Sequence, residues 1–190
     1  MQNKFPPIPE GVLPHPVVIE PYNRNWAKIA AETAWKLKGI LGENLLRVEH
    51  FGSTSIPGLA AKPVIDLMPI VKDLNKLDEQ KDLICNLGYV WRGEFSIAGR
   101  RFCPLTNEAG QRLIHLHFYQ ENREAIKRHL AFRDYLLAHP SIAKEYEREK
   151  RRAAKLHPDN SFAYTIEKSA WVQQHEKEAL QWYEENKCGQ

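Results

Sequence analysis

The chain has 190 residues, of which 43% are hydrophobic and 27% are charged, a composition typical of a globular protein with one domain. This length excludes a fusion of two enzymes. The formal net charge of +3 excludes a strongly basic protein that binds by neutralising many nucleic-acid phosphates, so nucleic acid is not implied as a partner.

The cysteines and the apolar runs predict the compartment. Cys85, Cys103 and Cys188 are widely separated and form no C-x-x-C motif, so we expect neither a disulfide framework nor a thiolate zinc site. No stretch approaches the roughly 20 apolar residues of a membrane span, and the first residues lack the apolar core of a signal peptide. We therefore expect a cytoplasmic protein with no membrane partner, while its oligomeric state stays open.

The first 71 residues predict an arm, a helix and two strands. Residues 1–16 hold five of the twelve prolines, which disfavour helices and strand pairing, so we expect an extended N-terminal arm there. Apolar residues at helical spacing predict a helix from Asn25 to Leu41, and Gly42 follows as a stop signal. The two predicted strands are LLRVEHF at 45–51 and VIDLMPIV at 64–71, with a loop rich in turn-forming residues between them.

The rest of the chain predicts more helices and strands. Asp73 is expected to cap a helix that runs to about Leu87 and ends at Gly88. Three strand candidates follow, and they read YVWRGEF, RRFCPL and RLIHLHFY. From residue 121 onward the pattern is helical, with one helix ending at His139 before Pro140, one running toward Leu156, and one from about Asn160 to Tyr183.

These elements predict an α+β fold with a mixed sheet flanked by helices. We expect an α/β core over residues 17–120 and a C-terminal helical part, residues 121–190, that packs on it. Residues 121–156 carry ten Lys/Arg against six Asp/Glu. This basic stretch is either a solvated helix face with pairs of opposite charge or a surface that faces an anion or RNA.

The first chemical signal is the loop that leaves the strand at 45–51. Gly52 and Ser53 allow backbone N–H groups and a hydroxyl to approach a phosphate closely, with Thr54 as a further polar neighbour. Turn chemistry alone also places such residues in loops that bind nothing. Asp66 strengthens the interpretation of a site, because an acid inside an apolar strand is costly to bury without a cation or a donor.

Motifs along most of the chain carry a family resemblance. They read EPYN, RVEHFGSTSIPGLAAKPVIDLMP, GYVWRGEFSIAGRRF, LIHLHFY, RHLAFRDYLLAHP and KLHPDNSFAYTIEKSAWV. With these motifs, residues 17–175 resemble the GrpB, or UPF0157, family, which is similar to the nucleotidyltransferase fold of DNA polymerase β. The resemblance implies a nucleotidyltransferase-like fold with a nucleoside triphosphate and divalent Mg or Mn as ligands. It maps Gly52 and Ser53 onto the Gly-Ser pair of that fold, and Asp66 onto its first, catalytic carboxylate.

The metal site departs from the usual nucleotidyltransferase pattern. Met68 stands where the fold has its second carboxylate, and a thioether is a poor ligand for a hard cation such as Mg²⁺. His115 and His117 alternate with apolar residues on a strand, so both imidazoles lie on one face. With Asp66 they would form a set of two histidines and one carboxylate that suits Mn, Fe, Ni or Zn, and His50 could add a fourth ligand.

Basic residues near these positions are candidates for binding phosphate. Lys62 lies between the Gly-Ser loop and Asp66, while Arg100 and Arg101 follow the Gly99 turn. Arg100 and Arg101 are neighbours on a strand, so only one of them can easily face the site.

Several functions remain open from the sequence. The first is a nucleotidyltransferase-like protein that binds a nucleoside triphosphate and a divalent metal and transfers a nucleotidyl group to an unknown acceptor. The second is a non-catalytic nucleotide- or metal-binding module, which Met68 favours. The third is an ATP-dependent ligase or a metal-assisted hydrolase that uses the same cleft. In each case the expected partner is a nucleotide or another phosphorylated small molecule.

Overall fold

The computed structural model describes residues 12–187. Residues 1–11, which make up most of the expected N-terminal arm, and Cys188 lie outside the described residues, and residues 12–19 contain neither helix nor strand. The described chain forms an α+β fold with a mixed four-stranded sheet, which confirms the predicted class. None of its described helices combines the length and the apolar character that crossing a membrane requires.

The described chain divides into two compact units that are not continuous in sequence. The first unit holds residues 12–13, 28–50 and 64–122, and the second holds residues 14–27, 51–63 and 123–187. A compact unit is not by itself an independent domain, so the boundary expected near residue 120 stays a prediction.

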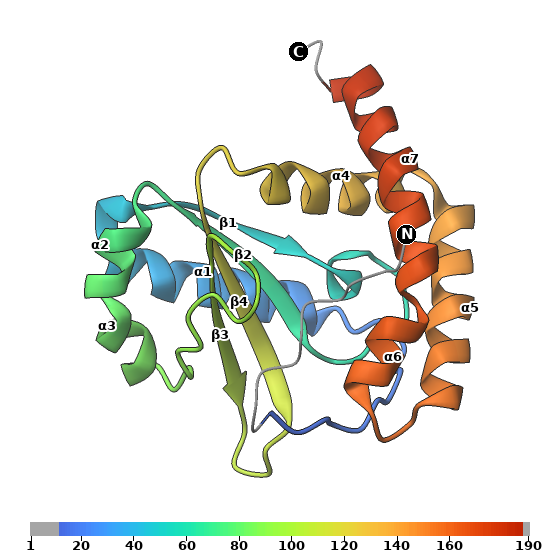
Figure 1. Ribbon diagram of the computed structural model, residues 1–190, viewed down its shortest axis with the longest axis horizontal. Helices are drawn as coiled ribbons and strands as arrows, with labels where there is room; N and C mark the ends of the chain where they lie inside the picture. Colours follow the sequence, from blue (N-terminus) through green and yellow to red (C-terminus); the bar gives the residue numbers. More distant parts are fainter. Residues whose placement is uncertain (1–11, 188–190) are drawn as a thin grey trace. The chain divides into compact units, whose positions relative to one another are not determined.

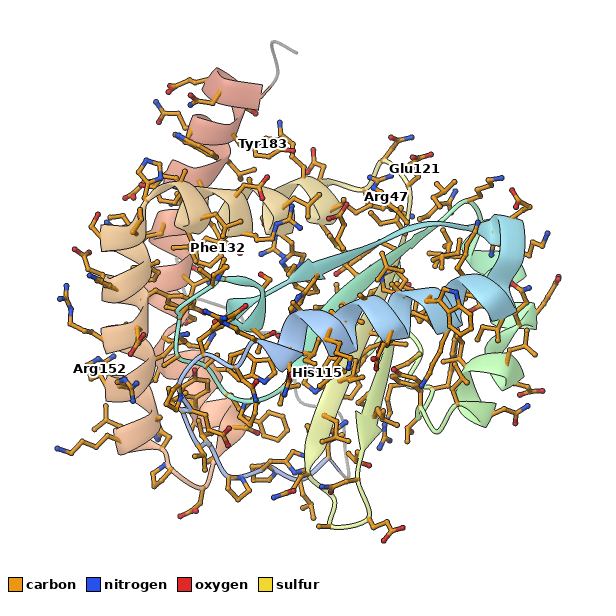
Figure 2. The ribbon with its side chains drawn as sticks, turned by 180° about the vertical axis from the view of Figure 1, so that it is seen from behind. Arg47, His115, Glu121, Phe132, Arg152 and Tyr183 are labelled. Atoms are coloured by element: carbon orange, nitrogen blue, oxygen red, sulfur yellow. The ribbon has the colours of Figure 1, made fainter. Side chains whose placement is uncertain are left out.

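The first unit is built on the sheet. Its strands lie in the order β1 (Leu45–Phe51), β2 (Ile65–Val71), β4 (Arg112–Gln120) and β3 (Arg100–Thr106). β2 and β4 are parallel, whereas β3 and β4 are antiparallel. Helix α1 (Asn25–Leu41) runs along one face of this sheet (Figure 1). Arg47 of β1 also pairs with Glu121, which follows β4, at 3.4 Å (Figure 2).

The two faces of the sheet differ in polarity. Leu67 of β2, Leu116 of β4 and Cys103 of β3 share one face and are almost completely buried, with exposures of 1%, 0% and 0%. Burying a leucine side chain contributes about 1.5–3 kcal/mol, so this face anchors the sheet. The opposite face carries Asp66 and His115, which are only partly buried, together with Met68, which is fully buried. The candidate site therefore lies on the polar face.

Three predicted elements differ from the structure. The helix expected from Asp73 to Leu87 is two short helices, α2 (Leu74–Glu79) and α3 (Lys81–Asn86), because the backbone of Gln80 leaves the helical region. Asp73 does cap α2, since its carboxylate accepts the N–H of Asn75 at 2.7 Å.

The helix expected from Asn160 to Tyr183 is also two helices, α6 (Ser161–Glu167) and α7 (Ser169–Lys187). At that break the Ser169 hydroxyl donates to the carbonyl of Ile166 and competes with the helical bonds.

The third difference concerns the first strand candidate. Residues 89–95 are not a regular strand, although part of this segment runs beside β3. The N–H groups of Val90 and Arg92 donate to carbonyls of Pro104 and Phe102 at 2.9 and 3.0 Å. The pairing stops because Phe95 and Ser96 adopt left-handed backbone angles, with φ of 47° and 64°, which turn the chain away.

The second unit is mostly helical. It contains α4 (Glu124–Ala138), α5 (Pro140–Leu156), α6 and α7, and Pro140 begins α5 at a position where its missing N–H costs nothing. Ile56 and Leu59 from the loop 51–63 pack against Leu136, Ala143 and Tyr146 in one apolar cluster. The loop after β1 therefore belongs to the core of the helical unit.

A buried lysine anchors this loop to α5. The ammonium of Lys150 donates to the carbonyl of Ala60, and the N–H of Ala60 donates to the carboxylate of Glu147 at 3.0 Å. Lys150 is only 1% exposed. Burial, together with the nearby charge of Lys168, lowers the pKa of Lys150 from 10.5 to about 7.

This lowered pKa predicts how the stability depends on pH. Between about pH 7 and about pH 10.5 the unfolded chain binds the Lys150 proton more strongly than the folded chain, so folding becomes more favourable as the pH rises. Relative to Lys150→Met, the parent should gain about 2 kcal/mol of unfolding free energy between about pH 7 and about pH 9, measured by urea denaturation. Lys155→Met, on the exposed side of α5, is the control and should follow the parent. Equal pH slopes in the parent and Lys150→Met would contradict the prediction.

Candidate functional site

Asp66, His115 and His117 come together on the polar face of the sheet. β2 and β4 are parallel with Asp66 beside His115, and His117 lies two residues further along the same face. Nδ1 of His115 is 3.1 Å from Oδ1 of Asp66, and Nε2 of His117 is 3.6 Å from the same oxygen. In the described part of the chain, these three residues are the group of metal-ligating side chains whose ligand atoms all lie within 4.8 Å of one another.

The electrostatics of the cluster favour an ionised acid. Burial alone would raise the pKa of the Asp66 carboxyl, but the hydrogen bonds and charges of His115 and His117 outweigh it and hold this pKa well below its usual range. For His117, burial lowers the pKa, although Asp66 opposes the change. The site therefore combines a carboxylate with an imidazole that favours its neutral form, and both are states that bind metals.

Arg100 and Phe102 of β3 complete the surroundings of the cluster. Phe102 lies beside both imidazoles, with ring centroids 5.2 Å from His115 and 5.0 Å from His117. The buried guanidinium of Arg100 donates to the carbonyl of Phe95 at 2.8 Å and to Nδ1 of His117 at 3.4 Å. A guanidinium can only donate, so Nδ1 of His117 accepts, and a neutral His117 then carries its proton on Nε2.

The remaining predicted basic and histidine residues have different surroundings. Arg101 lies on the opposite face from Arg100 and forms a two-pronged ion pair with Asp78, in which both N–O distances are 2.6 Å. His50 lies near the end of β1 and is not one of the three clustered side chains. Lys62 is partly buried and belongs to the second unit.

The Gly-Ser loop also belongs to the second unit, whereas the Asp66 cluster belongs to the first. Gly52 has φ of 72° and ψ of −175°, a conformation that is essentially restricted to glycine. It is followed by a single 3₁₀ turn, Ser53–Ser55, in which the Ser55 hydroxyl donates to the Gly52 carbonyl at 2.6 Å. The Ser53 hydroxyl forms no hydrogen bond within the described residues and is partly exposed, whereas Thr54 is buried.

The donor set decides which metal chemistry fits. One carboxylate and two imidazoles suit Mn²⁺, Fe²⁺, Ni²⁺ or Zn²⁺, which accept nitrogen ligands more readily than Mg²⁺. Met68, two residues after Asp66 on β2, is completely buried and supplies no oxygen. A single transition-metal ion therefore fits the residues present, whereas the paired Mg²⁺ arrangement of two carboxylates does not.

One residue of this neighbourhood, Phe102, and one contact, that of Arg100 with His117, were not predicted as parts of the site. Phe102 occupies the same face as Arg100 because it lies two positions further along β3, so period-two alternation could have identified it. The link from Arg100 to His117 has no such signal, because it depends on the pairing of β3 with β4. That pairing brings Phe102 opposite His117.

Comparisons with known proteins agree on one family for this chain. The family model described as GrpB protein matches residues 16–178. The UPF0157 protein YqkA of Bacillus subtilis is 40% identical over 161 residues, which are 85% of this chain but 46% of YqkA, so the chain spans about half the length of that relative. The glutamate-rich protein GrpB of Alkalihalophilus pseudofirmus is 31% identical, over 85% of this chain and 95% of its own length.

Solved structures agree with this family. The crystal structure of conserved protein GrpB from Enterococcus faecalis is 42% identical and has a TM-score of 0.82, and the match covers 87% of this chain and 99% of that one. A structure of Cid1, described as having RNA terminal uridylyl transferase activity, has 18% identity and a TM-score of 0.49 over 72% of this chain and 43% of that one.

The backbone of Gly52 predicts a local effect on stability. Gly52→Ala places a Cβ in a conformation that other residues avoid, so it should lower the free energy of unfolding by about 1–3 kcal/mol. Urea denaturation measures this loss. Ser53→Ala is the control, and it should change stability by less than about 0.5 kcal/mol because the hydroxyl has no partner within the described chain. A Gly52→Ala variant as stable as the parent would contradict the backbone assignment.

Proposed function

The chain belongs to the GrpB family, and we propose that it is a nucleotidyltransferase-like protein that binds one divalent metal ion and a nucleoside triphosphate. The metal ligands in this proposal are Asp66, His115 and His117. The phosphates of the nucleotide are assigned to Gly52 and Ser53. The proposal extends to the transfer of a nucleotidyl group to an acceptor and to a location in the cytoplasm.

One observation carries the metal half of the proposal. The ligand atoms of one carboxylate and two imidazoles all lie within 4.8 Å of one another on the polar face of the sheet. The other face of the sheet is packed with hydrocarbon. Placing an acid on an inner strand is costly, and the two imidazoles offset that cost, with His115 in a 3.1 Å hydrogen bond and His117 at 3.6 Å from the same oxygen. A bound divalent ion would supply electrostatic stabilisation of negative charge on phosphoryl oxygens.

The chain's own residues have definable parts in this function. Asp66 would contribute the charged ligand, while His115 and His117 would contribute neutral nitrogen ligands. Gly52, without a Cβ, would let backbone N–H groups approach a phosphate, and the Ser53 hydroxyl would donate to it. Arg100 would limit metal affinity, because it contacts Nδ1 of His117 and adds a positive charge beside the cluster.

The second candidate function is a binding module without transfer activity. Met68 supports it, because this fully buried thioether replaces the acid that the resembling fold uses to hold a second ion. Such a module would retain metal and nucleotide binding but release no pyrophosphate.

Calorimetric titration tests the metal site first. The parent should bind Mn²⁺, Ni²⁺ or Zn²⁺ more tightly than Mg²⁺, and Asp66→Asn and His115→Ala should each weaken binding of the tightest ion by at least about tenfold. Asp82→Asn and His157→Ala, which lie outside the cluster, are matched controls that should bind as the parent does. Unchanged affinity in both cluster variants would overturn the metal assignment.

The same samples then test the nucleotide. ATP, CTP, GTP and UTP are titrated with the preferred metal, and released pyrophosphate is measured. Release that is lost in Asp66→Asn supports transfer, whereas binding without release supports the binding module. A parent that binds none of the four nucleotides would overturn both readings.

Arg100 gives a separate prediction about metal affinity. A metal held by Nε2 of His117 needs the ring proton on Nδ1, and the Arg100 donor opposes this arrangement while adding a positive charge nearby. Arg100→Met should therefore tighten metal binding by about threefold or more in the same calorimetric assay. Arg101→Met, which loses the ion pair with Asp78 on the other face, is the control for general loss of charge. Weaker metal binding in Arg100→Met than in Arg101→Met would show that Arg100 supports the metal rather than opposing it.

A further inference from the structure

Two lysines of the second unit approach the same aromatic ring. The ammonium of Lys150 lies 4.8 Å from the ring centroid of Tyr146, and the ammonium of Lys168 lies 5.8 Å from it. Lys168 also donates to the hydroxyl of Tyr146 at 3.4 Å and lies 5.5 Å from the ring of Tyr164. Below about pH 7, where Lys150 is protonated, two cations thus lie close together in a mostly buried place.

No carboxylate neutralises these two cations. Within residues 12–187 neither Lys150 nor Lys168 forms an ion pair with an acid. The nearby acid is Glu147, whose carboxylate already accepts the N–H of Ala60 at 3.0 Å and pairs with Arg151 at 2.9 Å. The group contains one acid, Glu147, and three basic residues, Lys150, Arg151 and Lys168. Two positive charges therefore have no counter-charge. Buried charge of this kind is costly unless an anion offsets it.

Hydrogen-bond donors are also in excess at this place. Lys150 has three N–H groups and donates one hydrogen bond, to Ala60. The hydroxyl of Tyr146 accepts from Lys168, and its own hydrogen has no acceptor among the described residues. The group therefore offers several donors and carries a net positive charge, which is the requirement for binding an oxyanion.

The aromatic neighbours hold these donors in position. The ring of Trp171 stacks on that of Tyr146, with centroids 5.0 Å apart and an angle of 10° between the planes. His175 stacks on Trp171 in turn, with ring centroids 3.7 Å apart. Tyr146 is 6% exposed and Tyr164 is 5% exposed, so the rings are fixed by packing before any ligand arrives.

We propose that Lys168, Lys150 and the hydroxyl of Tyr146 form a binding site for a phosphate group of a phosphorylated small molecule. The partly buried Lys168 is the member that solvent reaches, while Lys150 supplies charge from the interior. Two positive charges and several donors match a dianion with several oxygens better than a single carboxylate. The lowered pKa of Lys150 agrees with a cation that lacks its counter-ion in the ligand-free chain.

This inference does not rest on the proposed function. All of its residues belong to the second unit, and none of them belongs to the Asp66 cluster. The site can therefore be tested in the absence of any metal.

Calorimetry with inorganic phosphate and tripolyphosphate, in EDTA, at constant chloride and at about pH 6, where Lys150 is protonated, tests the site. The parent should show saturable binding, and Lys168→Met should weaken it by about tenfold or more, with a smaller loss of about threefold in Tyr146→Phe. Lys144→Met removes an exposed lysine from the same helix and should bind as the parent does. Circular dichroism of each variant confirms that it is folded.

Three results would overturn the site. They are no saturable binding of either anion by the parent, equal affinity in Lys168→Met and the parent, and loss of binding in Asp66→Asn under the same metal-free conditions. The last result would place the anion at the Asp66 cluster. If Asp66→Asn loses metal binding but retains tripolyphosphate binding, the anion site is separate from the metal site of the proposed function. That result would support the anion site.

Discussion

The register between β2 and β4 is the constraint on which the candidate site depends. Because the two strands are parallel with Asp66 beside His115, one acid and two imidazoles lie on a single face. The alternate positions, Leu67 and Leu116, are 1% and 0% exposed and hold that register by burial. A slip of one residue would exchange the two sets and bury the charged groups in hydrocarbon, so packing on one face maintains the chemistry on the other.

Local patterns were sufficient for most elements of the fold. The strand at 45–51 and the helix from Asn25 to Leu41 were predicted with the bounds that the structure has, because apolar periodicity and a following glycine act over a few residues. The breaks near Gln80 and Lys168 were not predicted, since neither carries a proline or glycine. At the second break a serine hydroxyl competes with a helical carbonyl, which residue type alone does not reveal.

The site was predictable only in part, because its members are distant in sequence. Alternation along one strand placed His115 and His117 on one face, whereas the contact from Arg100 depends on how β3 pairs with β4. The burial of Lys150 was not predicted, although the spacing of residues in α5 indicates it. The buried residues of α5 are Ala143, Tyr146, Lys150 and Ala153, and their spacing of three and four places this lysine in the apolar stripe of the helix. Composition alone assigns such a lysine to solvent.

The attachment of Ala60 to α5 has a mechanical consequence. Both polar groups of this one peptide backbone are held by side chains of a single helix, the N–H by Glu147 and the carbonyl by Lys150. Ile56 and Leu59 add hydrocarbon contacts to the same helical cluster. A shift of α5 along its axis would therefore either break these contacts or carry the segment that follows Ser53 with it. A ligand that displaces either α5 or the loop would therefore act on the other through these side-chain contacts.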